Sequence, residues 1–125
     1  MKAPEIDEES IAKLMHSFYF KVRFNEHLGP VFAKRIPDDD QSWERHKEHI
    51  GSFWEGVLLG KVGFKGAPLQ AHYNLMPFPQ ELFYVWLALF EESLDEVYEE
   101  EPKAIFMARA EGIASKFMAN LYQGY

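Results

Sequence analysis

The chain has 125 residues, with 20 acidic and 13 basic side chains, a net charge of −7 and no cysteine. This length suits one hydrophobic core, so we expect residues 1–125 to form a single domain. The acidic surplus makes nucleic acid and anionic membranes poor partners, and the lack of cysteine excludes disulfides and thiolate metal sites. The N-terminus has no apolar signal core, and no apolar run approaches the ~20 residues that span a bilayer. We therefore expect a soluble cytoplasmic protein.

Helical periodicity begins with residues 10–24, whose apolar side chains from Ile11 to Val22 follow the i, i+3, i+4, i+7 spacing of one helix face. Pro30 can then open a short helix. The aspartates of the turn at 37–40 supply an N-cap, because carboxylates suit the positive end of a helix. A second long helix is expected to follow this turn, over 41–59.

Residues 60–79 have no clean period and are rich in glycine and proline. We expect a long connection with at most one helical turn, and connections of this length in compact domains are often functional. Two further helices are predicted over 79–99 and 102–122. No convincing alternating strand occurs, so the expected class is all-α with four main helices.

The five histidines do not fit the common metal motifs. None is preceded by glutamate at the third position before it, as a di-iron carboxylate bundle requires, and no HExxH is present. Nucleotide-binding loops of the types GxxxxGK[ST] and GxGxxG are absent, as is a GxSxG nucleophile elbow.

Four side chains remain as candidates for chemistry. His72 lies in the irregular connection and could project between two apolar-faced helices, although position alone favours a surface loop histidine. His46 lies on the apolar face of its helix, where a lone histidine is usually a boundary residue. Tyr19 and Trp86 are core or boundary aromatics by default, and each carries a donor that needs a partner when buried.

Several segments follow one another in an order and spacing that cover nearly the whole chain. They are Phe18-Tyr19 with Val22-Arg23, Leu28 to Phe32, His46 to Gly60, Gly66 to His72, Pro77-Phe78-Pro79, and Phe83 to Phe90. Together they resemble the truncated globin family, group III. No single piece is a strict motif, so the match depends on the order of all of them.

The resemblance implies a globin-like, two-over-two helical sandwich around haem b, held without covalent attachment because the chain lacks cysteine. His72 matches the proximal iron ligand. Distal ligand-binding positions match Tyr19, His46, Ile50 and Trp86. Haem-wall positions match Phe32, Phe53, Trp54, Leu75 and Phe78. His49, a second histidine near the distal face, departs from the family pattern. It leaves open whether His46, His49 or neither approaches the iron.

Such a site would bind O₂, NO and CO. Phenol and indole donors strengthen the binding of a ligand with partial negative charge, so the pattern favours oxygen and NO chemistry or peroxide-type redox work over bulk oxygen transport. Nitric oxide dioxygenase or peroxidase-like activity would need a reductase, and we expect a monomer. The alternative is a haem-free helical interaction or sensor module, which explains the amphipathic helices equally well.

Overall fold

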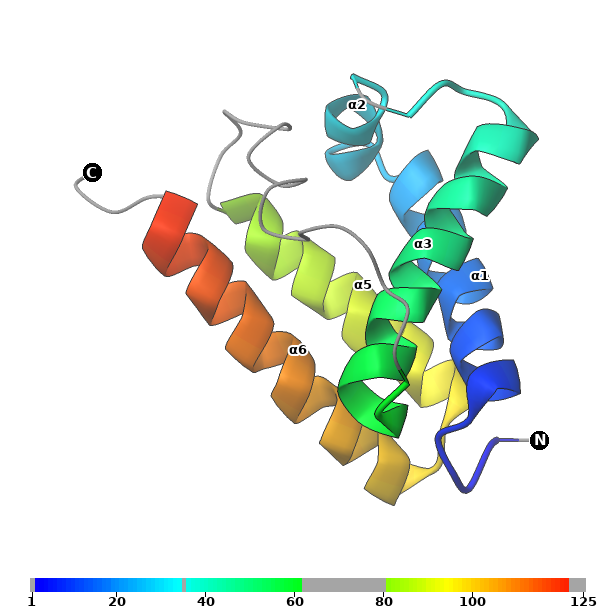
Figure 1. Cartoon of the computed structure of the whole chain (residues 1–125). Coiled ribbons are helices and arrows are strands. Elements are labelled where there is room, and N and C mark those ends of the chain that lie inside the picture. Colours follow the sequence, from blue (N-terminus) through cyan, green and yellow to red (C-terminus); the bar gives the residue numbers. More distant parts are fainter. Residues whose placement is uncertain (1, 35, 62–80, 122–125) are drawn as a thin grey trace.

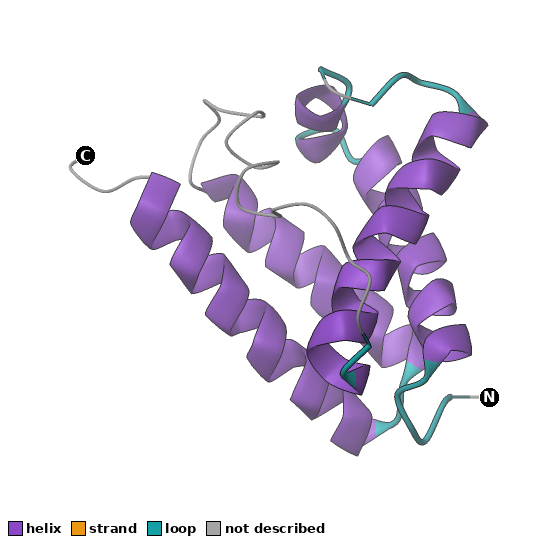
Figure 2. Cartoon of the chain, viewed as in Figure 1, coloured by secondary structure: helices purple, strands orange, loops and turns teal. Residues whose placement is uncertain are grey.

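The computed structural model describes residues 2–34, 36–61 and 81–121, in which the regular elements are helices (Figures 1 and 2). The all-α prediction is confirmed for these residues. The helices are α1 (Glu8–Phe24), α2 (Leu28–Phe32), α3 (Asp40–Leu59), α5 (Glu81–Val97) and α6 (Glu100–Leu121). None of the helices in these ranges is long and apolar enough to cross a membrane. Of the predicted connection over 60–79, all but Gly60 and Lys61 lies outside the described residues.

Helix α1 begins two residues before its predicted start because Asp7 and Ser10 form a capping box. The Asp7 carboxylate accepts from the Ser10 backbone N–H at 2.8 Å, and Ser10 Oγ accepts from the Asp7 N–H at 2.9 Å. Two N-terminal donors are thereby satisfied. The hydrogen bond from the Ser10 backbone N–H, followed by the contribution of the Ser10 side chain, holds the pKa of Asp7 below its usual value.

The N-cap of α3 is Asp39, which confirms the cap predicted in the aspartate turn. Asp39 Oδ1 accepts from the Ser42 backbone N–H at 2.7 Å, and Oδ2 accepts from the Ser42 hydroxyl at 3.0 Å. The helix ends at Gly60, whose φ of 71° is the left-handed conformation that glycine adopts without strain. Both ends of α3 therefore follow from local residue chemistry.

The corner between α5 and α6 is tied to the N-terminal segment. Ala3 N–H donates to the Val97 carbonyl at 2.7 Å, and Glu99 N–H donates to the Ala3 carbonyl at 3.0 Å. The buried Tyr98 hydroxyl donates to Ser10 Oγ at 2.8 Å. These bonds lie where α5 ends, two residues before the predicted end at 99, and hold the start of α1 against the corner.

The helices pack as two pairs, α1 with α3 and α5 with α6, and α1 also packs along α5 (Figure 1). This is the predicted two-over-two arrangement. Phe18, Phe90 and Phe106 are fully buried between the pairs. Their rings meet edge to face, with Phe18 and Phe90 centroids 5.0 Å apart. Aromatic packing thus joins the two layers and fixes the position of α1 and α3, which carry the candidate distal residues.

Candidate functional site

The structure brings together Tyr19 of α1 and His46 of α3, two of the predicted distal residues. Their ring centroids lie 4.7 Å apart with an interplanar angle of 86°. Tyr19 is buried, His46 is half-buried, and the imidazole Nε2 atom is enclosed. A phenol and an imidazole therefore face each other where the two helices pack.

Two further aromatic rings surround His46. Trp43 lies 6.0 Å from its ring centroid and Phe32, on α2, lies 6.2 Å away. Phe32 was among the predicted wall residues, whereas Trp43 was assigned only to the apolar face of its helix. Its place three residues before His46 on that face is the signal that pointed to this contact.

The Tyr19 side chain is buried, and its hydroxyl donates to none of the residues that the structure describes. Burial raises the pKa of Tyr19 well above the usual value of a phenol, because the ionised form would lose its hydration. A phenol is already protonated at neutral pH, and burial moves its ionisation still further from neutrality. A buried hydroxyl of this kind ordinarily finds a hydrogen-bond partner, so its surroundings suit a small polar ligand.

Phe18 contacts both Tyr19 and Trp86, which belongs to α5. The Trp86 ring stacks on Phe90 at 5.0 Å with an interplanar angle of 9°, and meets Phe18 edge to face at 5.2 Å. Phe18 in turn contacts Tyr19 at 4.8 Å. The two predicted donors thus sit on facing layers and are linked by one buried ring.

The remaining predicted residues of α3 lie farther along that helix. Ile50 and Phe53 are half-buried at the edge of the core. Trp54 is buried, stacked on Phe90 at 5.6 Å and against Phe106 at 4.9 Å, which places it among α3, α5 and α6. Exposed His49 is on the same helix, and the roles of all these residues stay predictions. His72, Leu75 and Phe78 lie outside the described residues.

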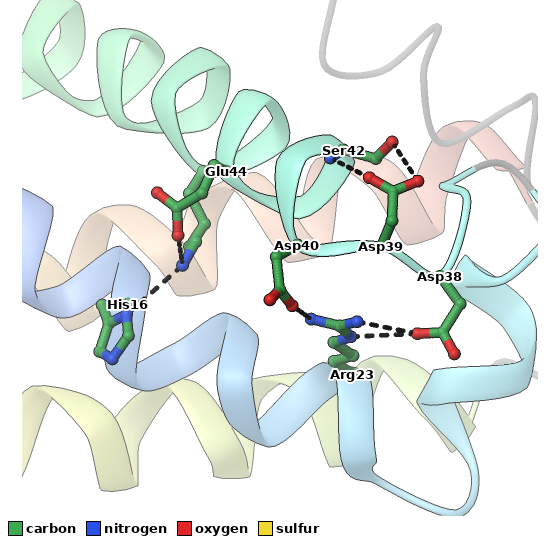
Figure 3. A network of polar contacts seen from close by, with 8 residues as sticks. His16, Arg23, Asp38, Asp39, Asp40, Ser42 and Glu44 are labelled. Atoms are coloured by element: carbon green, nitrogen blue, oxygen red, sulfur yellow. Dashed lines mark hydrogen bonds and ion pairs between the residues drawn. The ribbon is translucent and has the colours of Figure 1, made fainter.

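An ionic network joins the end of α1 to the start of α3 (Figure 3). Arg23 Nη1 donates to Asp40 Oδ1 at 3.0 Å, while Nε and Nη2 donate to Asp38 Oδ1 at 3.2 and 3.0 Å. These bonds, to Asp40 first and then Asp38, raise the pKa of Arg23. The guanidinium carbon also lies 5.7 Å from the centroid of the Trp43 ring. From the sequence these aspartates were predicted to form a helix cap alone, and their contact with Arg23 was not predicted.

A surface groove of about 350 Å³ runs between α1 and α3 beside this network. Its lining includes Arg23, Phe24 and Asp40 together with the rings of Tyr19 and Trp43. The exposed Phe20 also lines it, with its ring tilted against that of Phe24 and the ring centroids 5.0 Å apart. Since Tyr19 and Trp43 both contact His46 as well, they separate this groove from the interior.

A two-over-two helical fold with a buried phenol and an imidazole facing each other across its first two long helices defines a protein of the truncated globin class. No protein-family model matches the chain. The chain is 52% identical over 123 residues to group 3 truncated hemoglobin ctb of Campylobacter jejuni, covering 98% of this chain and 97% of that protein. The crystal structure of group III truncated hemoglobin from Campylobacter jejuni matches with a TM-score of 0.95 at 52% identity, covering 98% and 97% of the two chains. The chain belongs to the group 3 truncated haemoglobins, which confirms the resemblance and the predicted fold.

Membership of this family implies a haem cofactor and the binding of diatomic gas ligands. The arrangement of the described residues is also compatible with a bound haem. The Tyr19 side chain is buried and its hydroxyl donates to no described residue, and half-buried His46 stands beside it. Aromatic side chains surround this pair, as a flat apolar cofactor requires, with Phe32 and Trp43 nearest to the imidazole.

Proposed function

We propose that this protein binds haem b without covalent attachment, through His72, and holds O₂, NO or CO beside Tyr19, His46 and Trp86. When bound, haem supplies an iron with one open coordination position for such a ligand. The observation that carries the proposal is the buried Tyr19 side chain, which lies edge-on to His46 at 4.7 Å and whose hydroxyl donates to none of the described residues. Neutral imidazole, as in His72, is a suitable iron ligand.

Tyr19 supplies the main hydrogen bond to the ligand in this proposal. A ligand that carries partial negative charge gains roughly 1.5–3 kcal/mol from such a bond in a site that excludes water. Carbon monoxide is a weaker acceptor and gains less. The indole N–H of Trp86 provides a second donor from the facing layer, and His46, edge-on to Tyr19, acts as a gate between the ligand and solvent.

Two donors that hold oxygen tightly suit redox work better than transport. We assign the protein to nitric oxide dioxygenation or peroxide activation, in which the donors polarise the O–O bond and a separate reductase returns electrons. Oxygen transport would require easier release. The protein is proposed to act as a monomer in the cytoplasm, since a chain without cysteine suits a reducing compartment.

The first experiment is a titration of the purified protein with haemin, followed by absorption spectra of the ferric, ferrous and ferrous-CO forms. We expect a stoichiometric Soret band that shifts with CO and is weakened or lost in His72→Ala. The lack of a saturable band would instead support a haem-free helical module. In that case Tyr19, His46 and Trp86 would serve packing alone.

The second experiment compares Tyr19→Phe with Tyr98→Phe by stopped-flow measurement of ligand dissociation. Tyr19→Phe removes the hydroxyl beside His46 and should speed oxygen dissociation by about tenfold to a hundredfold, with a smaller change for CO. Tyr98→Phe also removes a buried hydroxyl, but one that donates to Ser10. It should leave both rates unchanged. Oxygen release at the wild-type rate in Tyr19→Phe would remove Tyr19 from this role.

A further inference from the structure

The wall between the surface groove and His46 is formed by two rings. Tyr19 and Trp43 line the groove, and the same rings contact the imidazole at 4.7 and 6.0 Å. One of these rings comes from α1 and the other from α3. Any change in the relative position of the two helices at this end therefore alters both the wall and the spacing of Tyr19 from His46.

Arg23 fixes the two helices at this end. It lies one turn after Tyr19 on α1, and its carboxylate partners, Asp38 and Asp40, flank the N-cap of α3 on either side (Figure 3). The guanidinium side chain is 19% exposed, so it is held against the protein although its partner carboxylates are open to solvent. We call Arg23, Asp38 and Asp40 the clasp.

The geometry of the clasp matters more than its charge. A single exposed ion pair contributes little to stability, because water and salt screen it. Here three N–H donors of one planar group reach two carboxylates, while the same plane lies over Trp43 and Phe24 at 5.7 and 5.4 Å from their centroids. A lysine ammonium carries the same charge without the rigid fork, so it cannot reproduce this arrangement.

We propose that Arg23 is a positioning residue for the distal side: through Asp38, Asp40 and Trp43 it sets the spacing of Tyr19 from His46 and keeps the groove closed toward them. The ligand-facing part of this inference rests on the proposed function. The control is Lys21, which lies on the same helix and donates to Glu96 at 2.9 Å, joining α1 to α5. Breaking that contact perturbs α1 without touching α3.

The test uses infrared spectra of the ferrous-CO protein, because the C–O stretch reports the polarity around the ligand. We expect a single band in the wild-type protein and in Lys21→Met, and a shifted or additional band in Arg23→Lys, together with oxygen dissociation at least about threefold faster. Asp38→Asn should change the spectrum in the same direction. Because the Asp38 carboxylate is largely exposed, Asp38→Asn should fold normally, and it can replace Arg23→Lys in the test if that variant fails to fold.

A second readout does not depend on haem. Hydrogen exchange of the backbone amides in the first turn of α3, at Ser42 and Trp43, should be faster in Arg23→Lys and unchanged in Lys21→Met. An unchanged C–O band in haem-loaded Arg23→Lys would overturn the positioning role, as would unchanged exchange in this turn. If the wild-type protein takes up no haem, the proposed function and the ligand-facing role of Arg23 both fail. Faster amide exchange in Arg23→Lys would still establish that the clasp holds the start of α3 against α1.

Discussion

At the scale of single residues, Trp86 allows a test of the second proposed donor. Trp86→Phe keeps a ring that can stack on Phe90 and meet Phe18, but it lacks the indole N–H. We expect oxygen to dissociate about tenfold to a hundredfold faster, since one charge-assisted bond contributes roughly 1.5–3 kcal/mol. Stopped-flow measurement of oxygen dissociation in Trp86→Phe, Tyr19→Phe and the double variant gives the coupling free energy between the two donors.

Donors that share one ligand should not act additively in that cycle. Strict additivity of the two free-energy changes would show that Tyr19 and Trp86 serve different ligands or act through packing. A Trp86→Phe variant with wild-type kinetics would leave Tyr19 as the sole proposed donor.

The proximity of Tyr19 and His46 was predictable from the sequence only through the family resemblance, because the two residues are far apart in the chain. Periodicity placed each on an apolar helix face, but no local pattern indicates which faces meet. The contact of Arg23 with Asp38 and Asp40 was missed for the same reason. The Arg23 partners, Asp38 and Asp40, belong to a run of three aspartates in a turn. Such a run indicates a helix cap when the sequence is read alone, and it does not indicate a contact with α1.

At the scale of the helices, two glycines predict opposite responses to alanine. A Cβ at Gly51 of α3 would lie 3.6 Å from Met15 Cγ and 3.9 Å from Ile11 Cγ2, which is ordinary contact. Gly51→Ala should therefore stabilise the protein by about 0.5–1 kcal/mol, because alanine loses less backbone entropy in a helix. Urea unfolding monitored by circular dichroism measures the change.

Gly29 of α2 provides the contrast. A Cβ there would lie 2.7 Å from the Arg23 carbonyl oxygen, so the backbone itself would have to move. Gly29→Ala should cost about 1–3 kcal/mol despite the better helix propensity of alanine. Stabilisation by both substitutions would mean that α2 approaches α1 less closely than these distances indicate.

The helix boundaries show what local sequence determines. The cap of α3 was predictable because the aspartates directly precede an apolar-faced run, and Asp39 occupies that position. The capping box formed by Asp7 and Ser10 was not predictable, because it lacks the usual sequence pattern Ser/Thr-x-x-Glu. The early end of α5 depends on Ala3, a partner distant in sequence, and so could not follow from the periodicity of residues 79–99.

At the scale of the whole molecule, the N-terminal segment closes the fold through Tyr98. The side chain is 1% exposed and its hydroxyl donates to Ser10, so the start of α1 and the α5–α6 corner share one buried polar contact. Burial, the largest cause, raises the pKa of Tyr98 from 10.0 to about 12, with the Ser10 hydrogen bond acting in the opposite direction. The contact therefore links the stability of the closed fold to alkaline pH.

This linkage predicts the response of Tyr98→Phe to pH. Below the unfolded value near 10, Tyr98 is protonated in both states and its contribution is complete; as pH rises toward about 12, only the unfolded chain loses the proton, so stability falls. At neutral pH the variant should be less stable by about 1 kcal/mol, the net contribution of a buried hydrogen bond. Near pH 11 the wild-type protein loses a similar amount, about 1 kcal/mol, so the difference between the two proteins should close. Urea unfolding of both proteins from pH 7 to 11 measures this, because lysine titration is common to them and cancels in the difference. A gap that stays constant across that range would mean that Tyr98 ionises equally readily in the folded and unfolded chain.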